Sequence, residues 1–447
     1  MLIKIIDPVE SVVSARDAGI IRPILSFPAV FYRDGLYKKE RVEYQKSTMT
    51  KSKDGSIYYF YTGFLDRIKS VLASRGIPCF IEGTIPKLPV YPQPITLRGD
   101  QVRLVQSILD GQRGTIQAAT GTGKTVLAAS IIHSFRKPTI FIVHTLTLVR
   151  QTAEEFKRFG LKNITSYTGE EKDLSGDIVV GTIQSFHKVP HLLSKFDVAV
   201  VDECHHISTF TGTYARVLRR LPCTVRIGLT ATLPTTEEAK MTIEGLLGPN
   251  LDTFTLEEGI SQGVLAKPII KLIKIPINYR VKELTRYQDV YDAGVVNNRL
   301  RNETVINTVK PYIDEGKTVL ILLTRIEHGE NLKRIAREKG LQPYFVQGST
   351  ESEQREDIKS AFKNKDIKLV IATVVFKEGV NIPSLNVICN AAGGKSEIAT
   401  LQSIGRGLRT TQDKKEVILI DFFDPSHYYL VDHFGTRLCL YFEEGWL

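Results

Sequence analysis

Long apolar runs, paired cysteines and low-complexity segments are all missing from this sequence of 447 residues. Its longest wholly apolar stretches, such as residues 319–323, fall far short of the ~20 residues that cross a bilayer. The five cysteines never approach Cys-x-x-Cys spacing, which argues against a disulfide framework and a cysteine zinc site. Asp7, Pro8 and Glu10 stand where a signal peptide needs an apolar run. The sequence therefore predicts a cytoplasmic chain that makes no contact with a membrane.

A large excess of one charge is also missing. The chain has 59 Lys and Arg against 49 Asp and Glu, a net charge of +10. That surplus is compatible with a polyanionic partner, but many proteins that bind no polyanion reach it as well. His187 and His191 stand four apart, but Pro190 interrupts the helix that would align them. The sequence thus predicts no structural metal and leaves a nucleic-acid partner open.

The organisation of the chain changes at residues 85–95, where four prolines favour an extended, semi-rigid linker. Before it, a helix over residues 7–15, three strands and a second helix predict a small α+β domain at residues 1–88. After it, short β-branched runs alternate with helix-length segments, which indicates parallel sheets covered by helices. We expect two such α/β lobes, at residues 89–262 and 263–447. The strand-like runs are residues 139–143, 178–181, 198–202, 225–229, 319–323, 369–372, 387–389 and 417–420.

The clearest chemical motif is AATGTGKT at residues 118–125, between a short strand and a helical run. The glycines let the backbone turn its N–H groups toward an anion, the lysine reaches the β- and γ-phosphates, and the threonine hydroxyl binds Mg²⁺. Alanine replaces the first glycine of the usual phosphate-binding loop, and a glycine-rich turn before a helix is the alternative interpretation. The residues assigned to ATP binding here are Ala118, Thr120, Gly121, Thr122, Gly123, Lys124 and Thr125.

A second motif is the apolar strand 198–201 that runs into Asp202 and Glu203. On the neighbouring parallel strand, Asp202 would hold Mg²⁺ from the far side and Glu203 would polarise the attacking water. The alternative is that these carboxylates cap the next helix. Together with the phosphate loop, the pair predicts ATP hydrolysis, with Lys124 and Glu203 as catalytic residues.

The run Asp202-Glu203-Cys204-His205 resembles motif II of the superfamily 2 helicases in its DExH form, and further helicase-like motifs follow in family order. The resemblance implies a glutamine, Gln101, that reads adenine, and a coupling set that links ATP hydrolysis to nucleic acid. That set is His205 with Thr230 and Thr232 of the Thr-Ala-Thr motif. It also implies nucleic-acid contacts by Thr145, Arg150, Thr182 and Gln184 in the first lobe and by Thr373 in the second.

The second lobe carries a run, Gln402 to Arg409, that matches motif VI of the same helicases. Arg406 and Arg409 lie three apart and so share one helix face, where the resemblance makes them arginine fingers, with Gln402 as a further catalytic residue. Gly379 belongs to a run similar to motif V and would contact the nucleotide. The usual aspartate of that motif is Asn381 here, which puts any ribose or coupling role at that position in doubt.

Within the superfamily, the DECHH run, the GRGLR run and a small basic domain ahead of the motor resemble phage helicases of the UvsW type. The resemblance implies two RecA-like lobes, ATP and Mg²⁺ as cofactors, and branched DNA in recombination, repair and replication as the substrate. It places the protein in the host cytoplasm if a phage encodes it, and no feature indicates a stable oligomer. An RNA helicase shares every motif and remains an alternative, as do a non-catalytic nucleotide-gated scaffold and a P-loop kinase.

The amino-terminal segment is basic and rich in tyrosine. Residues 1–95 hold 14 Lys and Arg against 9 Asp and Glu, half of the net charge of the chain. These side chains could bind phosphates while the tyrosines stack on splayed bases, or the tyrosines could form the core of a small sheet. The two interpretations are equally supported by the sequence. The side chains concerned are Lys38, Lys39, Arg41, Lys46, Lys51 and Lys53, with Tyr32, Tyr37, Tyr44, Tyr58 and Tyr59.

Overall fold

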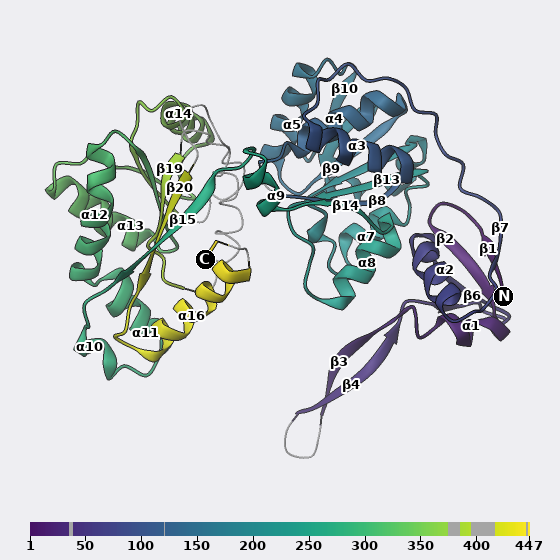
Figure 1. Ribbon diagram of the computed structural model, residues 1–447, viewed down its shortest axis with the longest axis horizontal. Coiled ribbons are helices and arrows are strands. Elements are labelled where there is room, and N and C mark those ends of the chain that lie inside the picture. The colour runs from purple at the N-terminus through teal and green to yellow at the C-terminus, as the bar shows by residue number, and fades with distance from the viewer. Residues whose placement is uncertain (35–38, 120, 374–384, 395–415, 444–445) are drawn as a thin grey trace. The chain divides into compact units, whose positions relative to one another are not determined.

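The structure is a computed structural model that describes residues 1–34, 39–119, 121–373, 385–394, 416–443 and 446–447 (Figure 1). These residues fall into two compact units, one within residues 1–255 and the other within residues 256–447. Within the described ranges, no helix combines the length and the apolar composition needed to cross a membrane.

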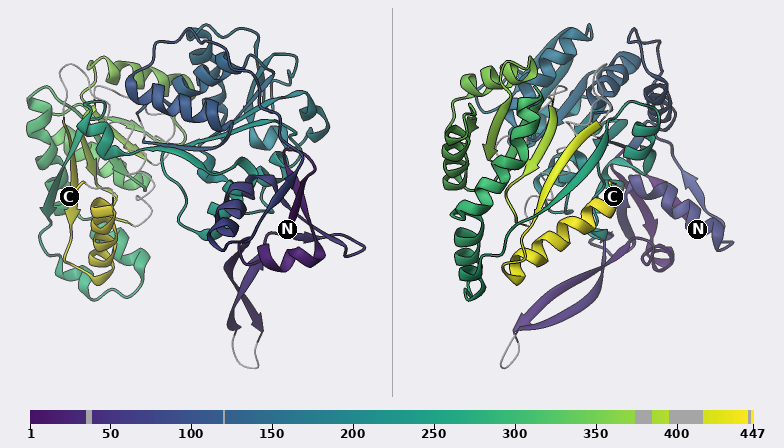
Figure 2. Two further views of the ribbon diagram at one scale, coloured as in Figure 1. Left: turned by 45° about the vertical axis from the view of Figure 1, so that its right-hand side comes forward. Right: turned by 60° about the vertical axis from the view of Figure 1, so that its left-hand side comes forward.

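The described amino-terminal residues form a five-stranded sheet in the order β5-β6-β2-β1-β7 and a separate antiparallel ribbon of β3 and β4. In both views of Figure 2 this ribbon extends away from the sheet. The domain is therefore α+β, as predicted, but the expectation of three strands was wrong: the described residues form seven, because β1 and β2 precede α1, β7 follows α2, and the short β5 pairs with β6. Its elements are β1 (Leu2–Ile5), β2 (Glu10–Ser14), α1 (Ala15–Ile21), β3 (Ser26–Asp34), β4 (Lys39–Ser47), β5 (Thr50–Lys51), β6 (Ile57–Tyr61), α2 (Leu65–Ser74) and β7 (Phe80–Glu82).

The helix expected over residues 7–15 was wrong, because this segment is a turn followed by β2. The Asp7 carboxylate accepts hydrogen bonds from the backbone N–H groups of Val9 (2.6 Å) and Glu10 (2.8 Å), so it closes a turn between β1 and β2. The helix starts later, where the Ser14 hydroxyl caps α1 by accepting from the Asp17 N–H.

The first lobe is a seven-stranded sheet, all parallel among the described residues, in the order β10-β11-β9-β12-β13-β8-β14. Alternate residues of its strands enter two different cores, as in a sheet buried on both faces: Phe141 packs with α3, α4 and α5, whereas Ile140 and Ile142 face α7 and α8. Its elements are α3 (Gly99–Gly111), β8 (Arg113–Ala118), α4 (Lys124–Phe135), β9 (Thr139–Val143), α5 (Leu146–Arg158), β10 (Ile164–Tyr167), β11 (Ile178–Thr182), α6 (Ile183–Phe186), β12 (Val198–Asp202), α7 (Thr213–Leu218), β13 (Val225–Thr230), α8 (Glu237–Leu247) and β14 (Asn250–Phe254).

The second lobe repeats the design with the strand order β15-β20-β19-β16-β18-β17, again parallel wherever the chain is described. Helices α12 and α13 cover one face of this sheet, and α14 and α16 cover the other. Two tandem RecA-like lobes are thus confirmed. The elements are α9 (Leu256–Ser261), β15 (Lys267–Lys274), α10 (Tyr279–Lys282), α11 (Tyr287–Tyr291), α12 (Arg299–Asp314), β16 (Thr318–Leu323), α13 (Ile326–Glu338), β17 (Tyr344–Val346), α14 (Ser352–Lys363), β18 (Leu369–Thr373), β19 (Leu385–Asn390), β20 (Glu416–Phe423) and α16 (Tyr428–Glu443).

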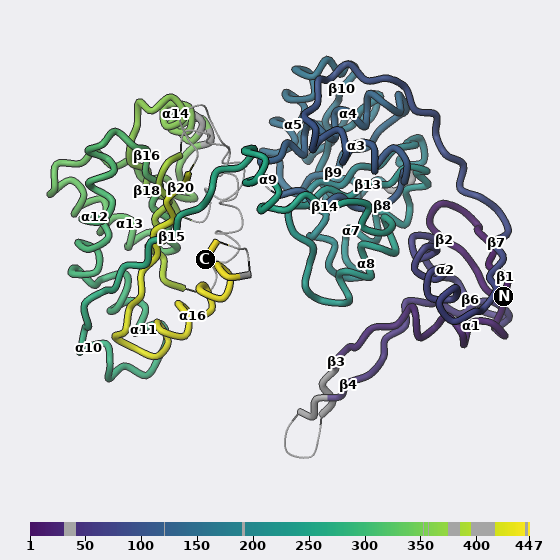
Figure 3. The backbone as a smooth tube through the Cα atoms, in the orientation of Figure 1, coloured from purple at the N-terminus to yellow at the C-terminus, as the bar shows by residue number. Residues whose placement is uncertain are grey.

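The proline-rich segment forms neither helix nor strand over residues 84–98, as expected of an extended connection (Figure 3). It is nevertheless held to the first lobe. The Gln112 side chain bonds both the N–H (2.8 Å) and the carbonyl (2.9 Å) of Leu88, and the Tyr91 N–H donates to the Ser134 carbonyl. The proline-rich segment is therefore bound to the first lobe, and it is called the strap below.

The amino-terminal domain and the first lobe share one hydrophobic core. The rings of Phe27 and Tyr61 stack on Phe210 of the lobe, with centroids 6.2 and 5.4 Å away. The Arg67 guanidinium forms a fork with the Glu244 carboxylate on α8 (2.6–3.0 Å). Because the ring contacts bury apolar surface of both parts, removal of residues 1–88 would expose part of the first-lobe core.

The contact between this domain and α8 gives a stability prediction. At Gly63 a Cβ atom would lie 2.1 Å from the Glu244 carbonyl and 2.5 Å from the Gly245 carbonyl, both of them backbone atoms that cannot move aside. We expect Gly63→Ala to destabilise the protein by about 1–3 kcal/mol, measured by urea unfolding. Gly19→Ala is the control, because nothing lies within 4 Å of that position. Equal stability of the two variants would contradict the packing described.

Candidate nucleotide and nucleic-acid sites

The predicted phosphate loop joins the end of β8 to the start of α4. Ala118 is the buried last residue of β8, and Thr122 is buried in the loop. Gly121 and Gly123 have φ angles of +93° and +94°, a conformation that favours glycine. Gly123 caps α4 without a side chain to bond the first-turn N–H groups, which are the groups of a helix that lack intrahelical partners. This helix start has the features of an anion site.

The two predicted catalytic residues of the first lobe lie together at this loop. Lys124 Nζ is 3.5 Å from Glu203 Oε1, and both side chains are nearly buried, with 12% and 10% of their surface exposed. Glu203 follows β12 with a left-handed φ of +47°, and its N–H donates to the Asp202 carboxylate (3.0 Å). A non-glycine residue in this conformation is uncommon and points to a constrained position.

The predicted coupling residues form a continuous chain of contacts with Glu203. His205 Nδ1 lies 3.3 Å from Glu203 Oε2 and 3.0 Å from the Thr230 hydroxyl oxygen. That hydroxyl donates its own hydrogen to the Thr232 carbonyl (2.7 Å), so it accepts from His205, and His205 carries its proton on Nδ1. The end of β12 and the end of β13 are thereby linked through one imidazole ring.

Two further histidines adjoin this chain and were missed from the sequence. The His206 ring lies 4.3 Å from His205 and 4.5 Å from His144, between ring centroids. Burial, helped by the two neighbouring imidazoles, lowers the pKa of His206 to about 4, so it is neutral at neutral pH. The available signal was the position of His144, directly after β9, which lies next to β12 in the sheet.

Gln101 lies beside the phosphate loop and is buried in the first turn of α3. A Cβ atom on Gly123 would be 2.7 Å from Gln101 Nε2, which measures how closely the amide approaches the loop. Its Oε1 accepts from the Arg98 N–H (3.2 Å). The position suits contact with a bound nucleotide.

The predicted nucleic-acid residues follow the carboxyl ends of strands in both lobes. Thr145 caps α5 after β9, and Thr182 ends β11 and caps α6, where Gln184 is exposed. Thr373 ends β18, and Arg150 is an exposed residue of α5 that reaches Glu170. In parallel sheets this edge is where ligands bind, and in the first lobe it also carries Lys124 and Glu203.

The remaining predicted site residues lie outside the described part of the chain. They are Thr120, Gly379, Gln402, Arg406 and Arg409. Within the described ranges, no group of three or more His, Cys, Asp or Glu side chains is arranged to hold a metal ion.

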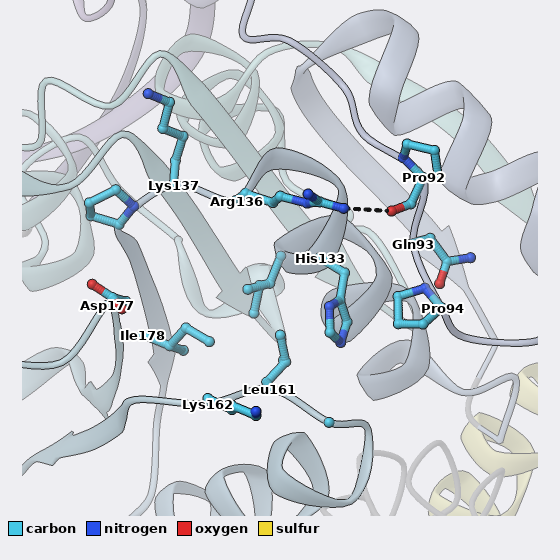
Figure 4. Close-up of a pocket in the computed structure, with 13 residues that line it drawn as sticks. Pro92, Gln93, Pro94, His133, Arg136, Lys137, Leu161, Lys162, Asp177 and Ile178 are labelled. Carbon is cyan, nitrogen blue, oxygen red and sulfur yellow. Dashed lines mark hydrogen bonds between the residues drawn. The ribbon is translucent and has the colours of Figure 1, made fainter.

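A cavity of about 740 Å³ lies away from these residues, at the amino ends of β9 and β11 (Figure 4). One wall is the strap residue Pro92, whose carbonyl accepts from Arg136 (3.3 Å). Because the strands are parallel, this edge is opposite the phosphate loop, so the cavity is not the predicted ATP site. Its other lining residues include Gln93, Pro94, His133, Lys137, Leu161, Lys162, Asp177 and Ile178.

Comparison with known families covers both lobes. Residues 94–235 match the family described as "Type III restriction enzyme, res subunit", and residues 301–411 match "Helicase conserved C-terminal domain". Among curated relatives, a putative helicase of a Sulfolobus islandicus filamentous virus is 28% identical over 342 residues. That alignment covers 69% of this chain and 60% of the viral protein.

A second relative is the ATP-dependent DNA helicase uvsW of phage T4, 24% identical over 337 residues that cover 71% of this chain and 66% of uvsW. The chain therefore spans about two thirds or less of the length of these two relatives. Among solved structures, S. cerevisiae Dbp5 bound to RNA and ADP BeF3 has a TM-score of 0.52 at 16% identity. That match covers 78% of this chain and 87% of Dbp5, and shows the shared fold.

Together, the tandem RecA-like lobes, the two matched domains and the relatives define a helicase of superfamily 2. The chain belongs to that superfamily. Within it, the chain is related to UvsW of phage T4.

Proposed function

We propose that this protein is an ATP-dependent DNA helicase or translocase that unwinds or branch-migrates branched DNA, such as Holliday junctions, forks and displacement loops. The proposal that ATP hydrolysis drives movement rests on the run of contacts from Lys124 through Glu203 and His205 to Thr230. Such a run ties a phosphate site to a neighbouring strand end, as coupled hydrolysis requires. The relation to a phage DNA helicase favours DNA. A role in recombination, repair and replication is proposed on the sequence resemblance alone.

The roles of the residues follow from their chemistry. Lys124 would balance the charge of the β- and γ-phosphates, and Glu203 would polarise the attacking water. The Thr125 hydroxyl and the Asp202 carboxylate are hard oxygen ligands of the kind Mg²⁺ prefers, and a bound Mg²⁺ would offset phosphate charge. Arg406, Arg409 and Gln402 are proposed to act on the γ-phosphoryl group, with Gly379 at the nucleotide, on the sequence alone.

For the chain as a whole, we propose a small basic domain at residues 1–88, a first lobe at 89–262 and a second lobe at 263–447, acting as a monomer. A movement of Glu203 on ATP binding or hydrolysis would reach Thr230 and Thr232 through His205. The nucleic-acid contacts would come from the strand ends that carry Thr145, Thr182 and Thr373, with Arg150 and Gln184 beside them.

The test of function compares ATP hydrolysis, measured by phosphate release, with a four-way DNA junction, a linear duplex and single-stranded RNA at one salt concentration. We expect the junction to stimulate most and ATP to drive its strand separation or migration. Stimulation by RNA alone would favour an RNA helicase, an alternative supported by the shared fold with RNA-bound Dbp5. No phosphate release with any polymer would leave a nucleotide-gated scaffold or a P-loop kinase.

The basic amino-terminal domain gives a separate prediction. Lys46 is engaged with Glu238 (2.8 Å) and Phe27, whereas Lys51 and Lys53 are exposed. If the last two bind phosphates, replacing both by alanine should flatten the plot of log affinity against log salt by about 0.9 for each lost contact. The measurement is junction binding across a salt titration. The control is Lys363→Ala with Lys368→Ala, two exposed lysines of the second lobe; an equal slope in both double variants would exclude the contact.

A further inference from the structure

A group of aromatic side chains, here called the tyrosine cluster, lies on the second lobe at the start of α16. It consists of Tyr287 on α11, Tyr428 and Tyr429 on α16, and the imidazoles of His427 and His433. The rings contact one another in sequence: Tyr428–Tyr429 at 4.1 Å, Tyr429–Tyr287 at 5.6 Å and Tyr287–His433 at 5.0 Å, between centroids. Figure 1 shows α11 beside the first turns of α16.

The outer rings of the cluster face solvent in this lobe. Tyr428 is 63% exposed and Tyr287 is 36% exposed, and Tyr279 on the adjacent α10 is 73% exposed. A lone exposed tyrosine needs no explanation, but several whose rings contact one another, here at tilted and edge-on angles, form an aromatic patch. With 63% of its surface exposed, Tyr428 is accessible to a further planar group.

Hydrogen bonds to neighbouring backbone groups fix the residues of the cluster in place. His427 Nδ1 accepts from the Tyr429 N–H (3.2 Å), so its proton is on Nε2, which donates to the Leu284 carbonyl (2.9 Å). The Ser426 hydroxyl accepts from the Asn278 N–H (2.9 Å), which fixes the start of α10 to the same turn. Prior ordering of this kind lowers the entropy cost of binding.

The cluster lies on the carboxyl-terminal edge of the sheet, where β15 and β20 lead into α10 and α16. The same edge carries Thr373 and, after β16, Thr324. The Tyr291 hydroxyl donates to the Ala392 carbonyl (2.7 Å) and accepts from the Thr324 hydroxyl (2.7 Å), while its ring lies 5.9 Å from Tyr287. The cluster is thus joined through the buried Tyr291 side chain to the end of β16, which pairs with β18, the strand that ends at Thr373.

Charged side chains of both signs surround the cluster. Segment 279–291 presents Arg280, Lys282 and Arg286 on its surface beside Glu283 and Asp289, and α16 presents Asp432 one turn after Tyr428. Cations beside exposed rings can hold backbone phosphates while the rings receive bases. An apolar partner surface would be less well matched by this mixture of charge and aromatic faces.

We propose that the tyrosine cluster is a stacking site for unpaired nucleobases, with Tyr428 as the outermost ring. The inference rests on the proposed nucleic-acid function and adds to it a preference for the bases of a displaced or unwound single strand. Stacking recognises the π-face that every base has, so the site would be tolerant of sequence but would require bases.

The test compares two strands of equal length, an oligothymidylate and a strand made of abasic sites, which share a backbone and differ in bases. Affinity of the full chain for each is measured by fluorescence anisotropy at one salt concentration. The unaltered protein should bind the base-bearing strand more tightly. Tyr428→Ala should lower affinity for that strand by about tenfold and leave affinity for the abasic strand unchanged.

Three further variants sharpen the result. Tyr428→Phe keeps the ring and should bind as the unaltered protein does, Tyr287→Ala should lose part of the base preference, and Tyr344→Ala, at an exposed tyrosine on β17, should lose none. A base preference that persists in Tyr428→Ala and Tyr287→Ala, or equal weakening for both strands, would overturn the stacking site. Failure of the unaltered protein to bind either strand would instead overturn the proposed function.

Discussion

Replacing Lys124 by alanine should abolish ATP hydrolysis, with a loss of about 10³-fold or more in turnover, and should abolish any strand remodelling. Lys124 stands at the first position of α4, beside the loop that bends through Gly121 and Gly123, and its ammonium group is directed to the Glu203 carboxylate. Among the described residues of this loop, it supplies the positive charge that the β- and γ-phosphates need. Phosphate release with saturating DNA is the measurement.

The matched control is Lys137→Ala, because Lys137 is an exposed lysine at the opposite edge of the same sheet. Most DNA binding should survive in Lys124→Ala, because the residues proposed to contact DNA lie on other strand ends. Thermal unfolding would show whether the fold is kept. Hydrolysis near the unaltered rate in a folded Lys124→Ala protein would show that the phosphates bind elsewhere.

The Glu203→Gln variant should bind ATP but turn it over more slowly, on the order of 10²-fold or more. Glutamine keeps the shape of the side chain and its contact distance to His205, but it lacks the charge that polarises water and pairs with Lys124. Two quantities are measured, the nucleotide dissociation constant and the single-turnover rate. The dissociation constant should stay within a few-fold of that of the unaltered protein, whereas the single-turnover rate should fall.

Glu170→Gln is the control for this second prediction, because Glu170 is an exposed carboxylate paired with Arg150 at 3.4 Å on the same lobe. Its turnover should equal that of the unaltered protein. If Glu203→Gln also hydrolyses ATP at that rate, another group activates the water, and the constrained backbone at residue 203 serves only the fold.

The sequence predicted those parts of the site whose chemistry is local. The phosphate loop, the Asp202-Glu203 pair and the strands that carry them are each specified by a few adjacent residues, and the strands form as expected. The tyrosine cluster was not predicted, because Tyr287 and Tyr428 are far apart in the chain and meet only when β15 and β20 pair. The turn at Asp7 was missed because a proline after an aspartate is also a common start of a helix.

The packing of the amino-terminal domain on the first lobe was also not predicted. The prolines after the domain indicate an extended linker, and nothing local in the sequence shows that Phe27 and Tyr61 stack on Phe210. The basic and tyrosine side chains of this domain fall into two groups in the structure: some contact other side chains of the protein, and others are exposed. Tyr58 lies under Arg22, with 5.1 Å between guanidinium and ring centroid, and Lys46 pairs with Glu238, whereas Lys51 and Lys53 remain exposed.

The shared core between the amino-terminal domain and the first lobe has a mechanical consequence. Residues 1–255 would unfold in one cooperative transition, because part of the apolar surface of each is buried only against the other. The stacked rings and the Arg67–Glu244 fork join the described residues of the domain directly to the lobe, so a displacement of the first lobe would carry the domain with it. If Lys51 and Lys53 hold DNA as proposed, that DNA would travel with the first lobe during each cycle of ATP hydrolysis.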